Sequence, residues 1–282
     1  MEDILAREIE ITSVNLRALD AHGTEKIRTC YLRDAARSLA DAVRESEETS
    51  PFYLGDLTRR FYLDHIRAIL PRRDDRVTFA RFLAQLADEL PFETAPLPGG
   101  RIAYFPGAAA HEAYRIFSGT MDAAVTYPGD FTAVCEEVYD GLCDYCILPI
   151  ANDSEGTLHR LRAMIDRYDL RIVMTCLVQS GDGENEFALL TREILGPMNG
   201  EACISLSAAL NSASDAAGIM DAASANSLEI LMAERMPGSS EDGTPVWDFR
   251  FLGDIRDFGG LLCYMSLEYP RYTPLGVFKA LK

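Results

Sequence analysis

The stretch from Cys143 to Leu158 reads CDYCILPIANDSEGTL, and it decides the fold of this chain. Its first half, Tyr145 to Ile150, is a short apolar run typical of a buried strand. The polar run from Ala151 to Gly156 follows, and apolar residues then recur at the spacing of a helix. α/β proteins hold anions where a strand ends at the start of a helix, because the first backbone N–H groups of a helix have no internal partner. The stretch therefore predicts an α/β fold with a site for an anionic ligand at this turn.

Strands and helices alternate on both sides of this stretch, within a zone at 100–196. Strands are predicted at 102–105, 123–127, 145–150, 170–178 and 187–191, with helices at 111–117, at 130–140 and from Leu158 onward. Such alternation predicts an α/β lobe with a mostly parallel sheet covered by helices.

The zone at 200–282 has a different order of elements. Strands are predicted at 203–210, 228–235, 246–252 and 275–280, and helices at 213–225 and 258–267. The order β-α-β-β-α-β is that of a ferredoxin-like domain, an α+β fold.

The zone at 1–95 contains few Gly and Pro residues. Apolar residues recur at helical spacing around Leu39, His65 and Phe82, which predicts three to four helices. The zone ends in a linker at 91–100 that is rich in Pro and Gly. The chain is therefore predicted to combine a helical region, an α/β lobe and an α+β domain.

Composition limits the classes of partner. The formal net charge is −17, which argues against nucleic acid because phosphate binding depends on Lys and Arg. No apolar run approaches the roughly 20 residues that a membrane helix needs. The N-terminal segment MEDILAREIE is acidic and polar, unlike a secretory signal. We therefore expect a cytoplasmic protein that binds neither nucleic acid nor a membrane.

Seven scattered cysteines form no disulfide pattern, and their odd number suits a reducing compartment. Cys143 and Cys146 make a C-x-x-C. A redox or metal role needs this pair at a helix start or beside a second Cys or His pair. Cys146 instead lies in the predicted apolar strand, which favours small buried apolar residues. We expect no metal and no cofactor.

The turn at 149–156 resembles the P-I-E-N-S-x-E-G signature of prephenate dehydratases. The matching positions are Pro149, Ile150, Asn152, Glu155 and Gly156, whereas Ala151 and Asp153 differ. Upstream, the segment YFPGAAAH at 104–111 resembles the family's Y-L-G-P-E-G-S-F-S-H, with a shorter loop and Ala in place of both serines. The resemblance implies the following substrate-binding candidates: Gly107, His111, Asn152, Asp153, Ser154, Glu155 and Gly156.

Simpler interpretations of these residue types stay open. His111 is either a ligand contact at a helix start or a solvated surface residue. Asn152, Asp153 and Ser154 are residue types that cap helices without any ligand. Glu155 is favoured early in a helix by the helix dipole.

The family's catalytic motif is Thr-Arg-Phe at the start of a strand. Thr191 and Arg192 offer the first two residues, but Glu193 follows them. Aligning Phe187 with the family's Phe is the better register, and it places Asn185 and Glu186 at the catalytic positions. Asn is a poor acid, and Glu in place of Arg reverses a charge beside a dicarboxylate substrate.

The family also has a second lobe between its signature turn and this strand, with the substrate in the cleft between the lobes. Here the segment at 172–179 runs almost directly into Phe187. The resemblance therefore implies that only a single lobe is present and that the second lobe is missing.

The zone at 200–282 resembles the ACT regulatory domain of the same family. The segment at 231–237 aligns with the I-E-S-R-P ligand motif, and Gly218 is nearest to the family's Gly-Ala-Leu. The resemblance implies Gly218, Glu234, Arg235 and Pro237 as ligand candidates and a homodimer formed through this domain.

The helical zone at 1–95 occupies the position of chorismate mutase in bifunctional mutase–dehydratases. A helical bundle with exposed arginines is the simpler interpretation, because the spacing of its charged residues does not reproduce the mutase pattern.

Two functions follow from these observations. One is a degenerate, non-catalytic homologue related to phenylalanine biosynthesis that binds a small molecule, such as an aromatic amino acid or a prephenate-like compound. The other is an active enzyme that converts prephenate to phenylpyruvate, water and carbon dioxide without a cofactor. The missing lobe and the altered Thr-Arg-Phe motif favour the first.

Overall fold

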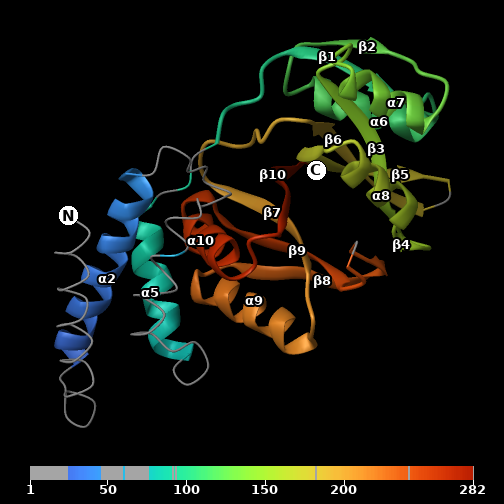
Figure 1. The fold of residues 1–282 in the computed structure, drawn as a ribbon. Helices are drawn as coiled ribbons and strands as arrows, with labels where there is room; N and C mark the ends of the chain where they lie inside the picture. The colour runs from blue at the N-terminus through green and yellow to red at the C-terminus, as the bar shows by residue number, and fades with distance from the viewer. Residues whose placement is uncertain are drawn as a thin grey trace. The chain divides into compact units, whose positions relative to one another are not determined.

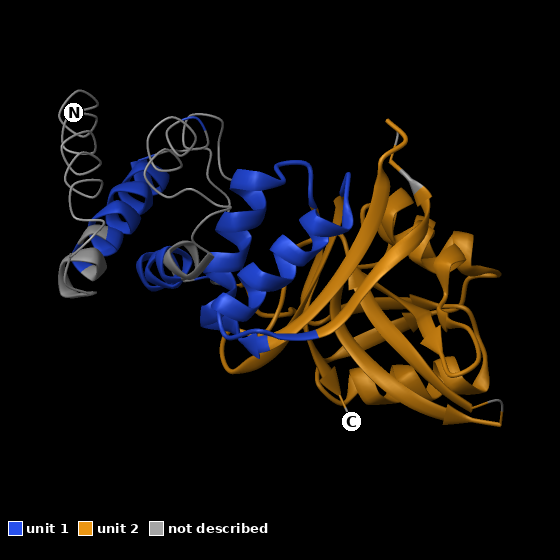
Figure 2. Ribbon diagram, turned by 90° about the horizontal axis from the view of Figure 1, so that it is seen from below, with its two compact units in different colours: residues 1–93, 210–230, 253–272 blue, residues 94–209, 231–252, 273–282 orange. Residues whose placement is uncertain are grey.

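The computed structural model describes residues 25–45, 60, 76–90, 92, 94–181, 183–240 and 242–281. These residues form two compact units, coloured separately in Figure 2. One unit comprises 1–93, 210–230 and 253–272, and the other comprises 94–209, 231–252 and 273–282. These boundaries differ from those of the three sequence zones, which stay a prediction. The helices expected near 61–68 lie outside the described residues.

Helices and strands follow the chain in the order labelled in Figure 1. The described elements are α2 (Glu25–Glu45), α5 (Arg76–Glu89), β1 (Gly100–Tyr104), α6 (Ala108–Ser118), β2 (Ala123–Thr126), α7 (Phe131–Tyr139), β3 (Tyr145–Asn152), β4 (Gly156–Thr157), α8 (His159–Arg167), β5 (Arg171–Ser180), β6 (Gly183–Thr191), β7 (Glu201–Ala209), α9 (Ala213–Ala225), β8 (Glu229–Ser239), β9 (Pro245–Asp254), η2 (Ile255–Asp257), α10 (Phe258–Glu268) and β10 (Thr273–Leu281). None of these helices is long and apolar enough to cross a membrane.

Ten strands form one mixed sheet in the order β2-β1-β3-β6-β5-β10-β7-β9-β8, with β4 paired to β3. β1 runs parallel to β2 and β3, but β6 is antiparallel to both β3 and β5. The expectation of a mostly parallel sheet was therefore wrong. β5 and β6 are joined by a tight hairpin, and a hairpin permits only antiparallel pairing.

Residues of alternate parity along β3 face two separate cores. Ile147 packs on one face with Ala113 and Phe117 of α6. Leu148 packs on the other face with Val134 of α7. Because successive strand residues point to opposite faces, α6 and α7 cover opposite sides of the sheet.

Side-chain ion pairs show that the sheet curls. Arg250 of β9 donates through Nη1 to both carboxylate oxygens of Glu186 of β6, at 2.8 and 3.1 Å. Three strands lie between β6 and β9 in the sheet order. In a flat sheet the two strands would be about 19 Å apart. This contact is possible only because the sheet bends around the core that contains Leu148.

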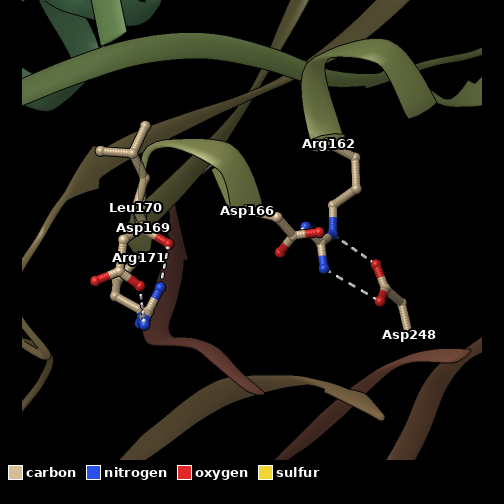
Figure 3. A network of polar contacts seen from close by, with 6 residues as sticks. All are labelled: Arg162, Asp166, Asp169, Leu170, Arg171 and Asp248. Carbon is tan, nitrogen blue, oxygen red and sulfur yellow. Dashed lines mark hydrogen bonds and ion pairs between the residues drawn. The ribbon is translucent and has the colours of Figure 1, made fainter. Parts of the chain in front are cut away.

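A second pair, Arg162 of α8 with Asp248 of β9, lies beside Asp166 in Figure 3. The Arg162 Nε donates to Asp248 at 2.6 Å, and the two residues are 7% and 2% exposed. Burial lowers the pKa of Arg162, but the carboxylates of Asp248 and Asp166 outweigh burial and raise it. The pair fastens α8 to the curled part of the sheet.

The helical unit is held together by α5, which packs against α2, α9 and α10. Every residue of α10 from Phe258 to Leu267 is buried. A side chain at Gly259 would meet the backbone of Leu90, and one at Gly260 would meet Leu83 and Asn226. Two consecutive glycines therefore allow the end of α5 to approach α10 closely.

Candidate functional site

The order of the first three strands reverses at β1. The chain passes from β1 through α6 to β2 on one side, and then through α7 to β3 on the other side of β1. α6 and α7 lie on opposite faces of the sheet. Ligands of open α/β sheets bind at such a reversal of strand order, outside the carboxyl ends of the strands.

Gly107 and His111, both candidates from the sequence, lie just after the carboxyl end of β1, at this reversal of strand order. Gly107 is the N-cap of α6, has extended backbone and would meet no atom within 4 Å if it carried a Cβ. His111 lies in the first turn of α6 and is exposed. Its Nδ1 is 2.9 Å from the hydroxyl of Tyr104.

Three tyrosines beside His111 were missed by the sequence reasoning. Tyr104 is 1% exposed, stacks on Tyr114 at 5.5 Å between ring centroids, and meets the edge of Tyr127 at 5.2 Å. Burial raises the pKa of Tyr104, and a hydrogen bond with Tyr127 adds to this effect. Tyr104 ends β1 and Tyr127 directly follows β2. Their positions near the ends of two predicted strands were the feature of the sequence that could have identified them as site residues.

The signature turn is a hairpin and not the start of a helix. Asn152 ends β3, the chain returns as β4, and α8 begins only at His159. Asn152 Oδ1 accepts hydrogen bonds from the Ser154 N–H at 3.0 Å and the Glu155 N–H at 2.7 Å. The side chain therefore closes its own turn, which is a common use of Asn. The prediction that this turn starts a helix and the interpretation of its residues as helix caps were therefore wrong, whereas their role in ligand binding stays a prediction. Leu158, the N-cap of α8, has no side-chain cap.

Asp153 ties this turn to the neighbouring β5–β6 hairpin. Its Oδ2 accepts from the Glu184 N–H at 2.9 Å, and its own N–H donates to the Glu184 carbonyl at 3.1 Å. Ser154 donates its hydroxyl to Asn152, while Glu155 and Gly156 are exposed. The polar groups of Asn152 and Asp153 are thus engaged within the chain.

The register of β3 and β6 places Asn185 directly opposite Asn152. The Asn185 amide donates to the Ser180 hydroxyl at 3.0 Å. Glu186 is held by Arg250, and Phe187 is buried. The side chains at these three motif positions therefore carry neither a hydroxyl group nor a positive charge.

The other placement of the motif lies at the opposite end of β6. Thr191 pairs with Arg171 at the start of β5, and Arg192 lies over the ring of Tyr139 at 4.9 Å. The dipeptide is thus remote along the strand from Asn185 and the signature turn.

The candidates in the zone at 200–282 are divided between the two units. Glu234 accepts a hydrogen bond from the Thr157 hydroxyl at 2.8 Å and lies 4.0 Å from Nε2 of His159. Arg235 and Pro237 follow it on β8 and are exposed. Gly218 belongs to the helical unit, where an added Cβ would meet the Tyr264 hydroxyl at 3.2 Å. The contacts of Glu234 join β8 to the start of α8.

The two cysteines of the C-x-x-C are buried. Cys146 lies in β3, as predicted, and burial raises the pKa of the Cys143 thiol to about 11. Cys143 donates to Glu137 at 3.1 Å. Within the described ranges, no three His, Cys, Asp or Glu residues are grouped so that they could hold a metal ion.

No protein-family model matches this chain, and no curated protein matches it. Solved structures do match. A prephenate dehydratase from Streptococcus mutans is 16% identical with a TM-score of 0.54, over 64% of this chain and 99% of that one. A prephenate dehydratase in complex with L-Phe from Arthrobacter aurescens is 13% identical with a TM-score of 0.51, over 64% and 90%.

GqqA, described as a novel type of quorum-quenching acylase, is 15% identical with a TM-score of 0.50, over 63% of this chain and 94% of that one. Proteins of this fold are therefore described with two different activities, so the fold alone does not assign a reaction. The chain has a mixed α/β fold similar to that of prephenate dehydratases.

Proposed function

We propose that this protein is a non-catalytic relative of prephenate dehydratase that binds a small molecule. The observation that carries the proposal is the ion pair between Glu186 and Arg250. In the family register, Glu186 occupies the position of the catalytic Arg, and here it neutralises a cation from β9. The position has a structural task in this chain.

The chemistry of the family supports the same conclusion. Loss of water and carbon dioxide from prephenate needs a proton donor at the departing hydroxyl and positive charge near two carboxylates. Asn185 is a weak acid whose amide is bonded to Ser180. Arg250 of β9, the cation that contacts the motif position Glu186, already has this carboxylate as its partner.

Several further features belong to this proposal. Only α8 and β5 lie between β4 and β6, which supports the absence of a second lobe. The order β7-α9-β8-β9-α10-β10 supports kinship of residues 200–282 with ACT domains. We propose a cytoplasmic homodimer formed through this region. Light scattering at high concentration should give the mass of two chains, and the mass of one chain would contradict the dimer.

A thermal-shift screen tests small-molecule binding. The panel is prephenate, chorismate, phenylalanine, tyrosine and tryptophan. A ligand that binds only the folded state raises the melting temperature, by RT ln(1 + [L]/Kd) in free energy. We expect a shift with at least one member of the panel. No shift with any of them at millimolar concentration would contradict the proposal.

An active dehydratase is the second candidate, and the pairing of Asn152 with Asn185 favours it. These positions of two family motifs lie side by side, as a preserved site would require. If the enzyme is active, Asn152→Ala and Asn185→Ala should each abolish formation of phenylpyruvate. Turnover of prephenate that both variants retain would exclude this site as its source.

A further inference from the structure

We propose that Asn199 is a site of spontaneous deamidation in the folded protein, where its side-chain amide is converted to aspartate and isoaspartate through a cyclic imide with Gly200. The inference goes beyond the proposed function and does not depend on it, because the reaction needs only water. Asn199 lies in the loop between β6 and β7. The reaction adds a negative charge there, and its isoaspartate product also adds a methylene to the backbone.

The chemistry is an attack of the Gly200 backbone nitrogen on the side-chain carbonyl carbon of Asn199. The nitrogen loses its proton and forms a bond to Cγ, and the side-chain nitrogen takes up a proton and leaves as ammonia. Water then opens the cyclic imide on either side of the ring nitrogen. Cleavage of the bond to Cγ gives aspartate, whereas cleavage of the bond to the backbone carbonyl carbon gives isoaspartate. Glycine favours the attack because it has no Cβ beside its nitrogen.

The pair lies at the surface, outside the regular elements. Asn199 and Gly200 are both exposed, and the preceding Met198 is 63% exposed. The φ of Gly200 is +79°, a left-handed conformation typical of a turn, and β7 begins only at Glu201. Water therefore reaches both the amide that is lost and the imide that is hydrolysed.

The attacking nitrogen is not held by the rest of the described chain. Among the residues that the structure describes, none forms a hydrogen bond with the Gly200 N–H or with the Asn199 side chain. The loop is anchored one residue earlier than Met198, where the Pro197 carbonyl accepts from Thr94 Oγ1 at 2.7 Å. The bonds between this anchor and β7 can therefore rotate to bring the nitrogen to Cγ without breaking a hydrogen bond.

The other described asparagines lack this combination. Asn199 is the only asparagine in the sequence that precedes a glycine. Asn185 precedes Glu186, which lies between β3 and β5 within the sheet. The remaining three each precede a residue whose N–H donates a hydrogen bond at 3.1 Å: Asp153 to Glu184, Ser212 to Asp215 and Ser227 to Ser224. The fold therefore restrains these asparagines and leaves Asn199 free to react.

The test keeps the full native chain at pH 8 over several weeks. Isoelectric focusing measures the acidic form, and peptide mass mapping locates the altered residue. We expect an acidic form whose change maps to Asn199, with both aspartate and isoaspartate at that position. Asn199→Ser should form acidic protein at least tenfold more slowly. Asn211→Ser is the matched control and should react like wild type, because Asn211 is also exposed but the Ser212 N–H is bonded to Asp215.

A second measurement separates the effect of the fold from that of the sequence. In urea the chain is unfolded, so its rate at Asn199 is that of the unrestrained sequence. We expect the native chain to react at Asn199 at a similar rate. A native rate at least tenfold below the unfolded rate would overturn the inference, as would a change that maps to another asparagine. The mapping uses the unaltered chain, so the test does not depend on how the variants fold.

Discussion

Glu186 and Arg250 join two strands of the curled sheet by an ion pair. Their side chains are 16% and 20% exposed, and Arg250 also lies over the ring of Phe278 at 5.5 Å. A pair this buried tolerates the loss of one partner poorly, because the remaining charge stays desolvated.

Glu186→Gln should therefore lower the free energy of unfolding by about 3 kcal/mol, since it leaves the Arg250 guanidinium without its carboxylate. Urea denaturation of the variant and wild type measures the loss. The matched control is Glu112→Gln, which breaks an exposed pair with Arg115 and should cost less than about 1 kcal/mol. Equal losses for the two variants would show that Glu186 does not hold the curled sheet.

At the same scale, the sequence selected candidate residues but did not show which residues they contact. The alignment on Phe187 selected Asn185 and Glu186, and only the register of β3 and β6 shows that Asn185 lies opposite Asn152. The Arg250 partner of Glu186 lies 64 positions away, and no local pattern specifies that pairing. The Tyr104–His111 contact depends on where β1 ends, and strand ends are poorly marked in sequence.

At the scale of elements, the described strands and helices beyond Gly100 largely follow the predicted ones. Apolar runs bounded by Gly, Pro and polar residues located them, and α9 has the predicted bounds. Strand direction was harder, because it depends on pairing between distant segments. The two-residue β4 carries no periodic signal, so a hairpin was mistaken for the start of a helix.

Position 276 of β10 requires a glycine. Its φ is +146°, and an added Cβ would overlap the backbone of Ile172 in the neighbouring strand β5. The register of the β10–β5 pair also shifts between Gly276 and Lys279. This glycine permits the close approach that joins the strands of two sequence zones in one sheet.

Gly276→Ala should be severely destabilising, by about 3 kcal/mol or more, because backbone strain and a backbone clash add together. Thermal and urea unfolding measure the effect. Gly200→Ala is the control: its φ is +79°, but an added Cβ meets nothing within 4 Å, so only about 1 kcal/mol of strain is expected. A Gly276→Ala protein as stable as the Gly200→Ala protein would contradict the described β5–β10 contact.

At the scale of the whole molecule, buried thiols link stability to alkaline pH. Burial raises the pKa of Cys143 to about 11 and those of Cys176 and Cys263 to about 12. Unfolded cysteines titrate near about 8.5. Above that pH the unfolded chain releases protons that the folded chain keeps. The free energy of unfolding therefore falls as the pH rises toward the thiol pKa values of the folded chain.

The free energy of unfolding should therefore fall between about pH 8.5 and 11, by about 1.4 kcal/mol per pH unit for each of these thiols. Urea denaturation under reducing conditions at pH 8, 9 and 10 measures the slope. Cys143→Ser should reduce the slope by the contribution of one buried thiol. Cys30→Ser should not change the slope, because Cys30 is exposed. A slope that both substitutions leave unchanged would contradict the burial of Cys143.

The central claim concerns the whole molecule: a fold similar to that of prephenate dehydratases, with its motif positions engaged in holding the sheet together. The most direct measurement is the rate at which purified wild-type protein forms phenylpyruvate from prephenate at neutral pH. We expect no increase over the spontaneous rate at any protein concentration. A rate that rises in proportion to protein concentration, and that Asn185→Ala removes, would contradict the account.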